Sequence, residues 1–188
     1  MKKIYLIHGW GGYPENNWFP WLKKELERRN FEVHPLKMPN PDEPKINEWI
    51  DFLIKNINVN EETYLIGHSM GCRAIIGFLE HCNKKIKGVI FVAGWIALNN
   101  LETDQEKETA KQWTNKIIDY NKVKEKADKF VAIFSNNDPF VPFKINSDFY
   151  KNKLNAEIIK EKNKGHFDDE AGIKELPIVV DKLLEMMK

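Results

Sequence analysis

Four short apolar runs constrain the fold of this chain more than any other feature of its sequence. They span residues 3–9, 63–69, 88–94 and 129–135, and large apolar residues follow one another in each almost without interruption. Continuous apolar strands of this length indicate burial on both faces, as in a parallel sheet covered by helices on either side. Two more mixed runs, at residues 31–38 and 156–162, are typical of edge strands.

Helical patterns separate these runs, at residues 18–29, 45–57, 71–82, 142–154 and 168–188. Strands that alternate with helices predict an α/β fold, with a mostly parallel six-stranded sheet and helices on both faces in three layers. Pro177 interrupts the last pattern, and we expect it to kink or split that helix. Within a single domain of residues 1–188, the long polar stretch 96–128 predicts one or two exposed helices that form a small helical cap insertion.

Charge and cysteine usage narrow the class of protein. The chain has 29 basic and 28 acidic residues, so its net charge of +1 gives no reason to expect nucleic acid or a membrane as a partner. No apolar run approaches the roughly 20 residues that span a bilayer, and the N-terminal run is too short for a signal peptide. Cys72 and Cys82 are about 15 Å apart on one predicted helix, too far for a disulfide. We therefore expect free thiols and a cytoplasmic protein.

The sequence GHSMG, residues 67–71, stands where the third apolar run meets a helix. It matches the G-x-S-x-G nucleophile elbow, a sharp turn that forces the serine, here Ser69, into a strained backbone conformation. Glycines two positions before and after Ser69 avoid a collision with the tightly folded neighbouring backbone. The turn exposes the hydroxyl in a cleft and places the Met70 N–H at a helix N-terminus, where it can stabilise an oxyanion.

Two further residues with catalytic chemistry follow neighbouring strands. Active sites in open parallel sheets gather at the carboxyl ends of strands, where Asp138 follows the fifth run and His166 the sixth. A serine hydroxyl needs a base to take its proton, a role that suits His166, with Asp138 orienting the imidazole. Asp128 precedes its strand and Asp148 lies within a predicted helix, so both are weaker candidates for the acid. The predicted catalytic residues are Ser69, Asp138 and His166.

The glycine-rich loop HGWGG, residues 8–12, follows the first run at the same edge. We predict that its Trp10 N–H is the second oxyanion donor. A dinucleotide fingerprint does not fit, because Pro14 stands where the third glycine would be needed. We predict that Trp10, Trp95 and Ile96 contact the substrate, although burial in the core explains a tryptophan after the fourth run equally well.

Two histidine-containing stretches have simpler explanations. His68 precedes the nucleophile, and a histidine there more often packs or hydrogen-bonds than acts as a second base. The sequence HFDDE, residues 166–170, contains metal-ligand types, but carboxylates at the start of the last helix are favoured by the helix dipole. No second cluster with known ligand spacing accompanies it, so we expect no metal.

These motifs resemble the α/β-hydrolase superfamily, and within it the YdeN-like serine hydrolases, a branch that includes retinoblastoma-binding protein 9. The similarity rests on HGWGG, on WFPW at residues 18–21, on GHSMG, and on the DPFVP and GHF endings. It extends over nearly the whole chain and is weakest in segment 96–128. The resemblance implies the strand order 2-1-3-4-5-6, the same three catalytic residues, and hydrolysis of esters or amides without a metal or cofactor.

The sequence thus predicts a serine hydrolase that cleaves a small-molecule ester or amide through an acyl-enzyme. A carboxylesterase for small acyl groups fits best, because the short chain has no large lid domain to enclose a lipid. A peptidase or thioesterase could use the same triad, since fold does not determine the substrate. The alternative from another class is a protein-binding or scaffolding member in which catalysis is dispensable, although nothing in the chain indicates a protein partner.

Overall fold

All six predicted strands form, and all of them are parallel. The computed structural model describes residues 2–188, in which the strands are β1 Lys3–Ile7, β2 Glu32–Leu36, β3 Thr63–His68, β4 Ile86–Val92, β5 Ala127–Ser135 and β6 Glu157–Glu161. They form one sheet in the order β2-β1-β3-β4-β5-β6, which confirms the order that the resemblance implies. In the register of the sheet, Lys3 of β1 lies opposite Glu32 on one side and Thr63 on the other.

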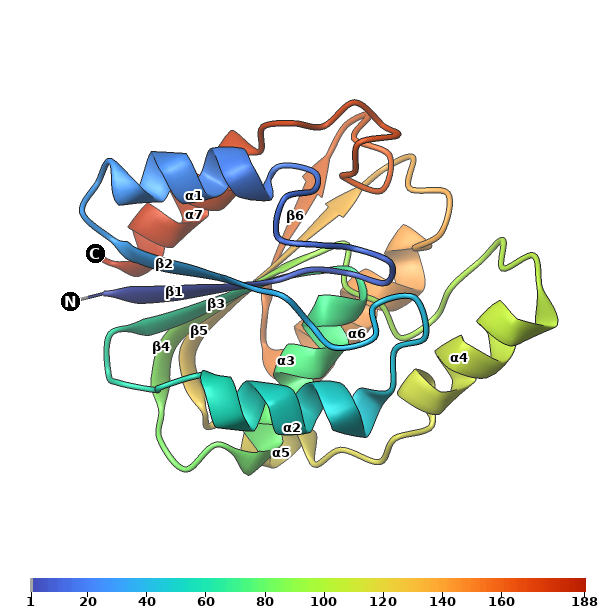
Figure 1. Cartoon of the computed structure of the whole chain (residues 1–188), viewed down its shortest axis with the longest axis horizontal. Coiled ribbons are helices and arrows are strands. Elements are labelled where there is room, and N and C mark those ends of the chain that lie inside the picture. The colour runs from blue at the N-terminus through green and yellow to red at the C-terminus, as the bar shows by residue number, and fades with distance from the viewer. Residues whose placement is uncertain (1) are drawn as a thin grey trace.

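The helices cover both faces of this sheet. They are α1 Phe19–Glu27, α2 Ile46–Asn56, α3 Met70–His81, α4 Asp104–Thr114, α5 Tyr120–Lys124, α6 Phe143–Leu154 and α7 Pro177–Met186. Figure 1 shows α1 and α7 on one face and α2, α3, α5 and α6 on the other, while α4 lies to the side of both layers. The predicted three-layer α/β fold is therefore confirmed.

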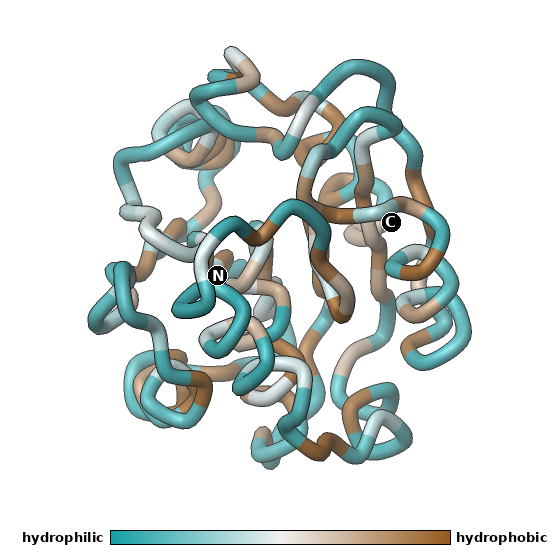
Figure 2. Tube along the Cα trace, turned by 90° about the vertical axis from the view of Figure 1, so that its right-hand side faces the viewer, coloured by the Kyte–Doolittle hydropathy of each residue, from teal (hydrophilic) through white to brown (hydrophobic). Residues whose placement is uncertain are grey.

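The core follows the burial that the strand patterns predict. Every residue of β3 is buried, whereas the edge strand β6 has no fully buried residue. Figure 2 shows hydrophobic and hydrophilic residues alternating along the helices. This is expected when one face of a helix packs against a sheet and the other faces solvent. Within residues 2–188, no helix combines the length and the apolar composition needed to cross a membrane.

The last helix is shorter than predicted, because α7 begins at Pro177 and is not kinked by it. Proline is favoured at the first helical position, where its missing N–H is not needed and its φ is already helical. Leu176 before it is kept out of the helical region, at φ −138° and ψ 73°. Residues 168–172 form turns instead, so the carboxylates of residues 168–170 do not open a helix as expected.

Segment 96–128 contains two helices, α4 and α5, where one or two were expected. The N-terminus of α4 is a capping box, in which the Thr103 hydroxyl accepts from the Glu106 N–H and the Glu106 carboxylate accepts from the Thr103 N–H. The segment ends earlier than predicted, because Ala127 and Asp128 already belong to β5.

Candidate active site

The turn between β3 and α3 has the strain that the elbow motif predicts. Ser69 lies at φ 50° and ψ −118°, a region that residues with a side chain rarely adopt, and such strain costs on the order of 1–3 kcal/mol. Its N–H still donates to the Val92 carbonyl of β4 at 2.8 Å, so the sheet holds the backbone up to the serine itself.

The two glycines of the motif are explained by the closeness of neighbouring backbone. A Cβ on Gly71 would lie 2.3 Å from the Ile7 carbonyl oxygen and 2.6 Å from that of His8. A Cβ on Gly67 would lie 2.9 Å from the Cys72 nitrogen. A Cβ atom essentially never lies within 3.0 Å of non-bonded backbone, so the elbow requires glycine at both positions.

The three predicted catalytic residues lie in one chain of hydrogen bonds. The distance from Ser69 Oγ to His166 Nε2 is 3.0 Å, and the distance from His166 Nδ1 to Asp138 Oδ2 is 2.9 Å. The Asp138 side chain is 2% exposed, and its other oxygen accepts from the N–H groups of Phe140 and Val141. With both oxygens engaged, the carboxylate is held in one orientation toward the imidazole.

The loops after β5 and β6 are joined by side chains that the sequence analysis did not single out for a role at the site. The Ser135 hydroxyl accepts from the Lys164 N–H at 3.0 Å, and the Asn137 side-chain oxygen accepts from the Gly165 N–H at 2.9 Å. Ser135 in turn donates to Asn137. The available signal was the polar sequence SNN, residues 135–137, directly before Asp138, because short polar side chains commonly hydrogen-bond to nearby loop backbone.

The loop after β1 packs directly against Ser69, the candidate nucleophile. A Cβ on Gly9 would lie 3.0 Å from Ser69 Cβ, so the glycine allows the contact. The N–H groups of Gly11 and Gly12 donate to main-chain carbonyls, whereas the Trp10 N–H has no acceptor within residues 2–188. The Met70 N–H is the first of α3, where backbone donors have no partner within the helix. Both predicted oxyanion donors thus remain available.

His8 supports this loop as a neutral side chain. Its Nε2 accepts from the Met38 N–H at 3.0 Å, so its Nδ1 carries the proton and donates to the Gly9 carbonyl at 2.8 Å. Burial lowers the pKa of His8, which keeps it in this neutral form.

A cleft opens beside Ser69 and His166 as two adjoining cavities of about 300 and 370 Å³. The larger cavity has an apolar wall, formed by Trp10, Trp95, Leu98, Leu101 and Phe140. Trp10 and Trp95 both line this cavity, and Trp95 is at the same time part of the core, with 1% of its surface exposed.

Ile96 is not among the residues that line either cavity. Its N–H donates to the side-chain oxygen of buried Asn146 at 2.7 Å, which directs the chain so that Leu98 and Leu101 reach the cleft instead. The sequence analysis did not predict Leu101 or Phe140 at this wall, because both are brought there by loops.

The cleft is acidic although the chain as a whole is nearly neutral. Four carboxylates line the two cavities, and the lining residues include no lysine or arginine within the described part of the chain; the four are Glu106, Asp168, Asp169 and Glu170. Asp169 pairs with Lys174, while one oxygen of Asp168 accepts from the Ala171 N–H. These carboxylates would therefore repel a negatively charged ligand that enters the cleft.

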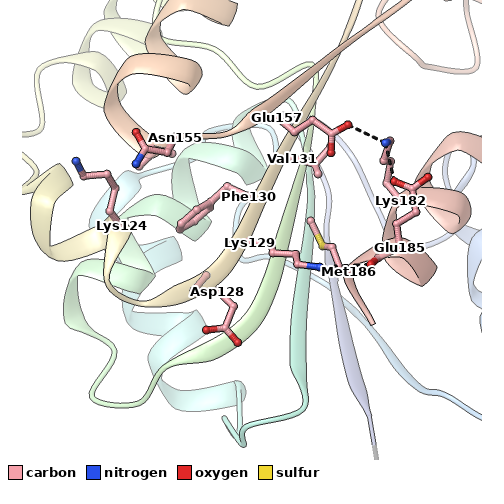
Figure 3. Close-up of a pocket in the computed structure, with 12 residues that line it drawn as sticks. Lys124, Asp128, Lys129, Phe130, Val131, Asn155, Glu157, Lys182, Glu185 and Met186 are labelled. Carbon is pink, nitrogen blue, oxygen red and sulfur yellow. Dashed lines mark hydrogen bonds and ion pairs between the residues drawn. The ribbon is translucent and has the colours of Figure 1, made fainter. Parts of the chain in front are cut away.

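A larger cavity of about 430 Å³ lies at the other end of the sheet, around the first residues of β5 and β6 (Figure 3). Most of its charged side chains are paired, either with one another or, for Asp128, with Lys85 and Lys87 nearby. Figure 3 shows Lys182 between Glu157 and Glu185, each at 2.7 Å. Its described lining residues include no serine, cysteine or histidine, and it lies away from the strand ends where Ser69, Asp138 and His166 meet, so the cleft at Ser69 is the candidate active site.

Comparison with known proteins identifies the family of the chain. The family model described as "Serine hydrolase" matches residues 4–185. The chain is 37% identical to the putative hydrolase YdeN of Bacillus subtilis over 97% of its own length and 94% of the relative's. It is 26% identical to the serine hydrolase RBBP9 of Rattus norvegicus, over 86% and 84% of the two chains.

The crystal structure of the ydeN gene product from B. subtilis superimposes on the chain with a TM-score of 0.88, at 33% identity, covering 100% of this chain and 99% of the other. Sequence and structure lead to the same assignment over almost the full length. The chain therefore belongs to the serine hydrolase family, in its YdeN-like branch.

Proposed function

We propose that the protein is a carboxylesterase for small, uncharged acyl groups, which acts through Ser69, His166 and Asp138. The observation that carries this proposal is the unbroken hydrogen-bond chain from Asp138 to Ser69, which ends in a cleft with an apolar wall. A binding protein has no need for a strained serine, an oriented imidazole and a buried carboxylate in this arrangement.

Each residue has a defined part in the reaction. Ser69 Oγ attacks the ester carbonyl carbon while His166 Nε2 takes the hydroxyl proton, and Asp138 stabilises the imidazolium that forms. The N–H groups of Trp10 and Met70 donate to the oxyanion, and one such donor typically contributes about 2.7–4 kcal/mol to the transition state. His166 then protonates the departing alcohol, which leaves an acyl group on Ser69. A water molecule activated by His166 releases the acid.

The size and chemistry of the cleft support small apolar acyl groups. A cavity of about 370 Å³ lies near the lower end of the range that is usual for small-ligand sites, and it is lined by tryptophan, leucine and phenylalanine on one side. The carboxylates that line the cleft disfavour anionic substrates.

We also propose that the segment from residue 96 to α5 is a fixed cap within a single domain rather than a mobile lid. Leu98, Leu101 and Glu106 of this segment line the cleft. The segment is tied to the body by Arg73 of α3, whose side chain is buried and donates to the Trp113 carbonyl at 2.8 Å and to the Tyr120 hydroxyl at 3.2 Å.

The proposal is tested in two stages. A fluorophosphonate probe, followed by mass mapping, is expected to label Ser69 in the intact protein and to leave Ser69→Ala unlabelled. Hydrolysis of an ester, a thioester and an amide that share one butyryl group then separates the esterase from a thioesterase or peptidase. Failure of the folded protein to label would favour the protein-binding alternative. Labelling with a preference for the thioester or the amide would retain the triad and overturn the carboxylesterase.

A further inference from the structure

His68, the residue before Ser69, contacts the loop that carries His166. His68 ends β3, and its side chain is buried beside that of His166, with 5.0 Å between the ring centroids. His68 Nε2 lies 2.8 Å from the main-chain oxygen of His166. Because a carbonyl oxygen only accepts, the Nε2 atom of His68 carries a proton and donates it.

His68 is a neutral hydrogen-bond donor at neutral pH. Burial lowers its pKa to about 3, and the neighbouring His166 acts in the same direction. Its Nδ1 faces Gly9, at 3.6 Å from where a Cβ would stand. The basic nitrogen of His68 is therefore Nδ1, which faces Gly9, whereas Ser69 Oγ is hydrogen-bonded to His166 Nε2, so His68 is not the base for Ser69.

The loop that His68 holds is strained and needs such support. Phe167, directly after His166, has φ 56°, which is uncommon for a bulky residue. Its carbonyl accepts from the indole N–H of Trp18 at 3.0 Å. Two consecutive carbonyls, those of residues 166 and 167, are therefore each held by one buried ring N–H.

We infer that His68 is a positioning residue, which holds the His166 carbonyl so that the imidazole of His166 lies between Ser69 and Asp138. This inference rests on the proposed function, because it concerns the same triad. His68 and Ser69 are adjacent in the chain, so one turn of backbone would place both the nucleophile and the loop that carries its base. No contact between His68 and the substrate is implied.

Two substitutions separate the hydrogen bond from simple packing. His68→Leu removes the donor, whereas His68→Gln retains an amide N–H at about the position of Nε2. Trp113→Phe is the control, because it removes a buried ring N–H that donates to the Pro44 carbonyl at 3.0 Å, away from the His166 loop. Circular dichroism and a thermal melt establish that each variant is folded.

The first readout does not depend on activity. A strong hydrogen bond between His166 Nδ1 and Asp138 produces a downfield proton resonance, which His166→Gln assigns by its loss. We expect this resonance in the wild type, in His68→Gln and in Trp113→Phe, and its loss or displacement in His68→Leu. An unchanged resonance in folded His68→Leu, or no such resonance in the wild type, would overturn the inference.

The second readout is hydrolysis of a short-chain ester across pH. A displacement of the base by about 1 Å can cost about 100-fold in rate, so we expect kcat of His68→Leu to fall roughly 10- to 100-fold with little change in KM. His68→Gln should recover most of the loss. Equal losses in both variants would refute the role of the hydrogen bond. If Ser69 of the wild type resists the fluorophosphonate while the resonance behaves as expected, the proposed function fails and the positioning of His166 stands.

Discussion

Adding one methyl group at the elbow tests the geometry on which the whole site depends. In Gly71→Ala the new Cβ would stand 2.3 Å from the Ile7 oxygen and 2.6 Å from the His8 oxygen, where carbon–oxygen contacts are normally about 3.3–3.6 Å. Both oxygens belong to the backbone at the end of β1, so no rotation of a side chain relieves the overlap. The elbow and the loop 8–12 would have to separate by about 1 Å.

The matched control is Gly77→Ala on the same helix. Its Cβ would lie 2.3 Å from Cδ1 and 2.8 Å from Cγ1 of Ile50, both of them side-chain atoms that a rotation of Ile50 can move, whereas the backbone at Gly71 cannot rotate away. Overpacking typically costs about 1–3 kcal/mol, and alanine regains up to about 1 kcal/mol of helix propensity over glycine in a helix interior. We therefore expect Gly71→Ala to lose about 3 kcal/mol of unfolding free energy, and Gly77→Ala to lose less than about 1 kcal/mol.

Urea unfolding followed by circular dichroism measures the two losses, and the rate of fluorophosphonate labelling reports on the site. Separation of the elbow from loop 8–12 would also move the Trp10 N–H away from the Met70 N–H, so Gly71→Ala should label about 100-fold more slowly. Equal unfolding midpoints and equal labelling rates for the two variants would refute the close backbone contact at Gly71.

Two further outcomes are expected. The pKa of His68 is near 3 when folded but about 6.5 in an unfolded chain, so between these values only the unfolded state binds the proton and stability falls with acidification. From pH 7 to pH 5 this costs about 2 kcal/mol, and urea titrations should find His68→Gln less sensitive to pH by that amount; an identical pH dependence would contradict the burial of a neutral histidine. Repulsion between unit charges about 8 Å apart in water is about 0.5 kcal/mol, so Asp168 and Glu170 together predict about fivefold lower kcat/KM for an ester whose acyl group carries a carboxylate than for its neutral isostere. Added salt or Asp168→Asn should narrow this difference, and a preference for the anionic ester would show that these carboxylates do not face the substrate.

Local patterns were sufficient for most of the fold. The strand and helix patterns predicted every strand and the approximate position of each helix, because burial on both faces of a parallel strand leaves a continuous apolar run. The error at the last helix also has a local origin. Pro177 was treated as an interruption, but a proline is more favourable as the first residue of a helix, and α7 begins there.

The grouping of the three proposed catalytic residues was predictable for a similar reason. A parallel sheet brings the exits of its strands to one edge, so Ser69, Asp138 and His166 could be grouped from their order and their strands alone. The motif GHSMG also encodes its own strain, and the structure places Ser69 at the positive φ that the motif requires.

Interactions between near neighbours and the direction of the strands are therefore enough to predict the layers of the fold, the elbow and the three residues that we propose as the triad. Which side chains surround these residues depends on tertiary packing. The Ile96 N–H donates to the Asn146 side chain, while Leu101 and Phe140 line the cleft. The His68 side chain donates to the carbonyl of His166, which is 98 residues away in the sequence. Such contacts depend on how loops pack against each other, and no periodic pattern in the chain records that packing.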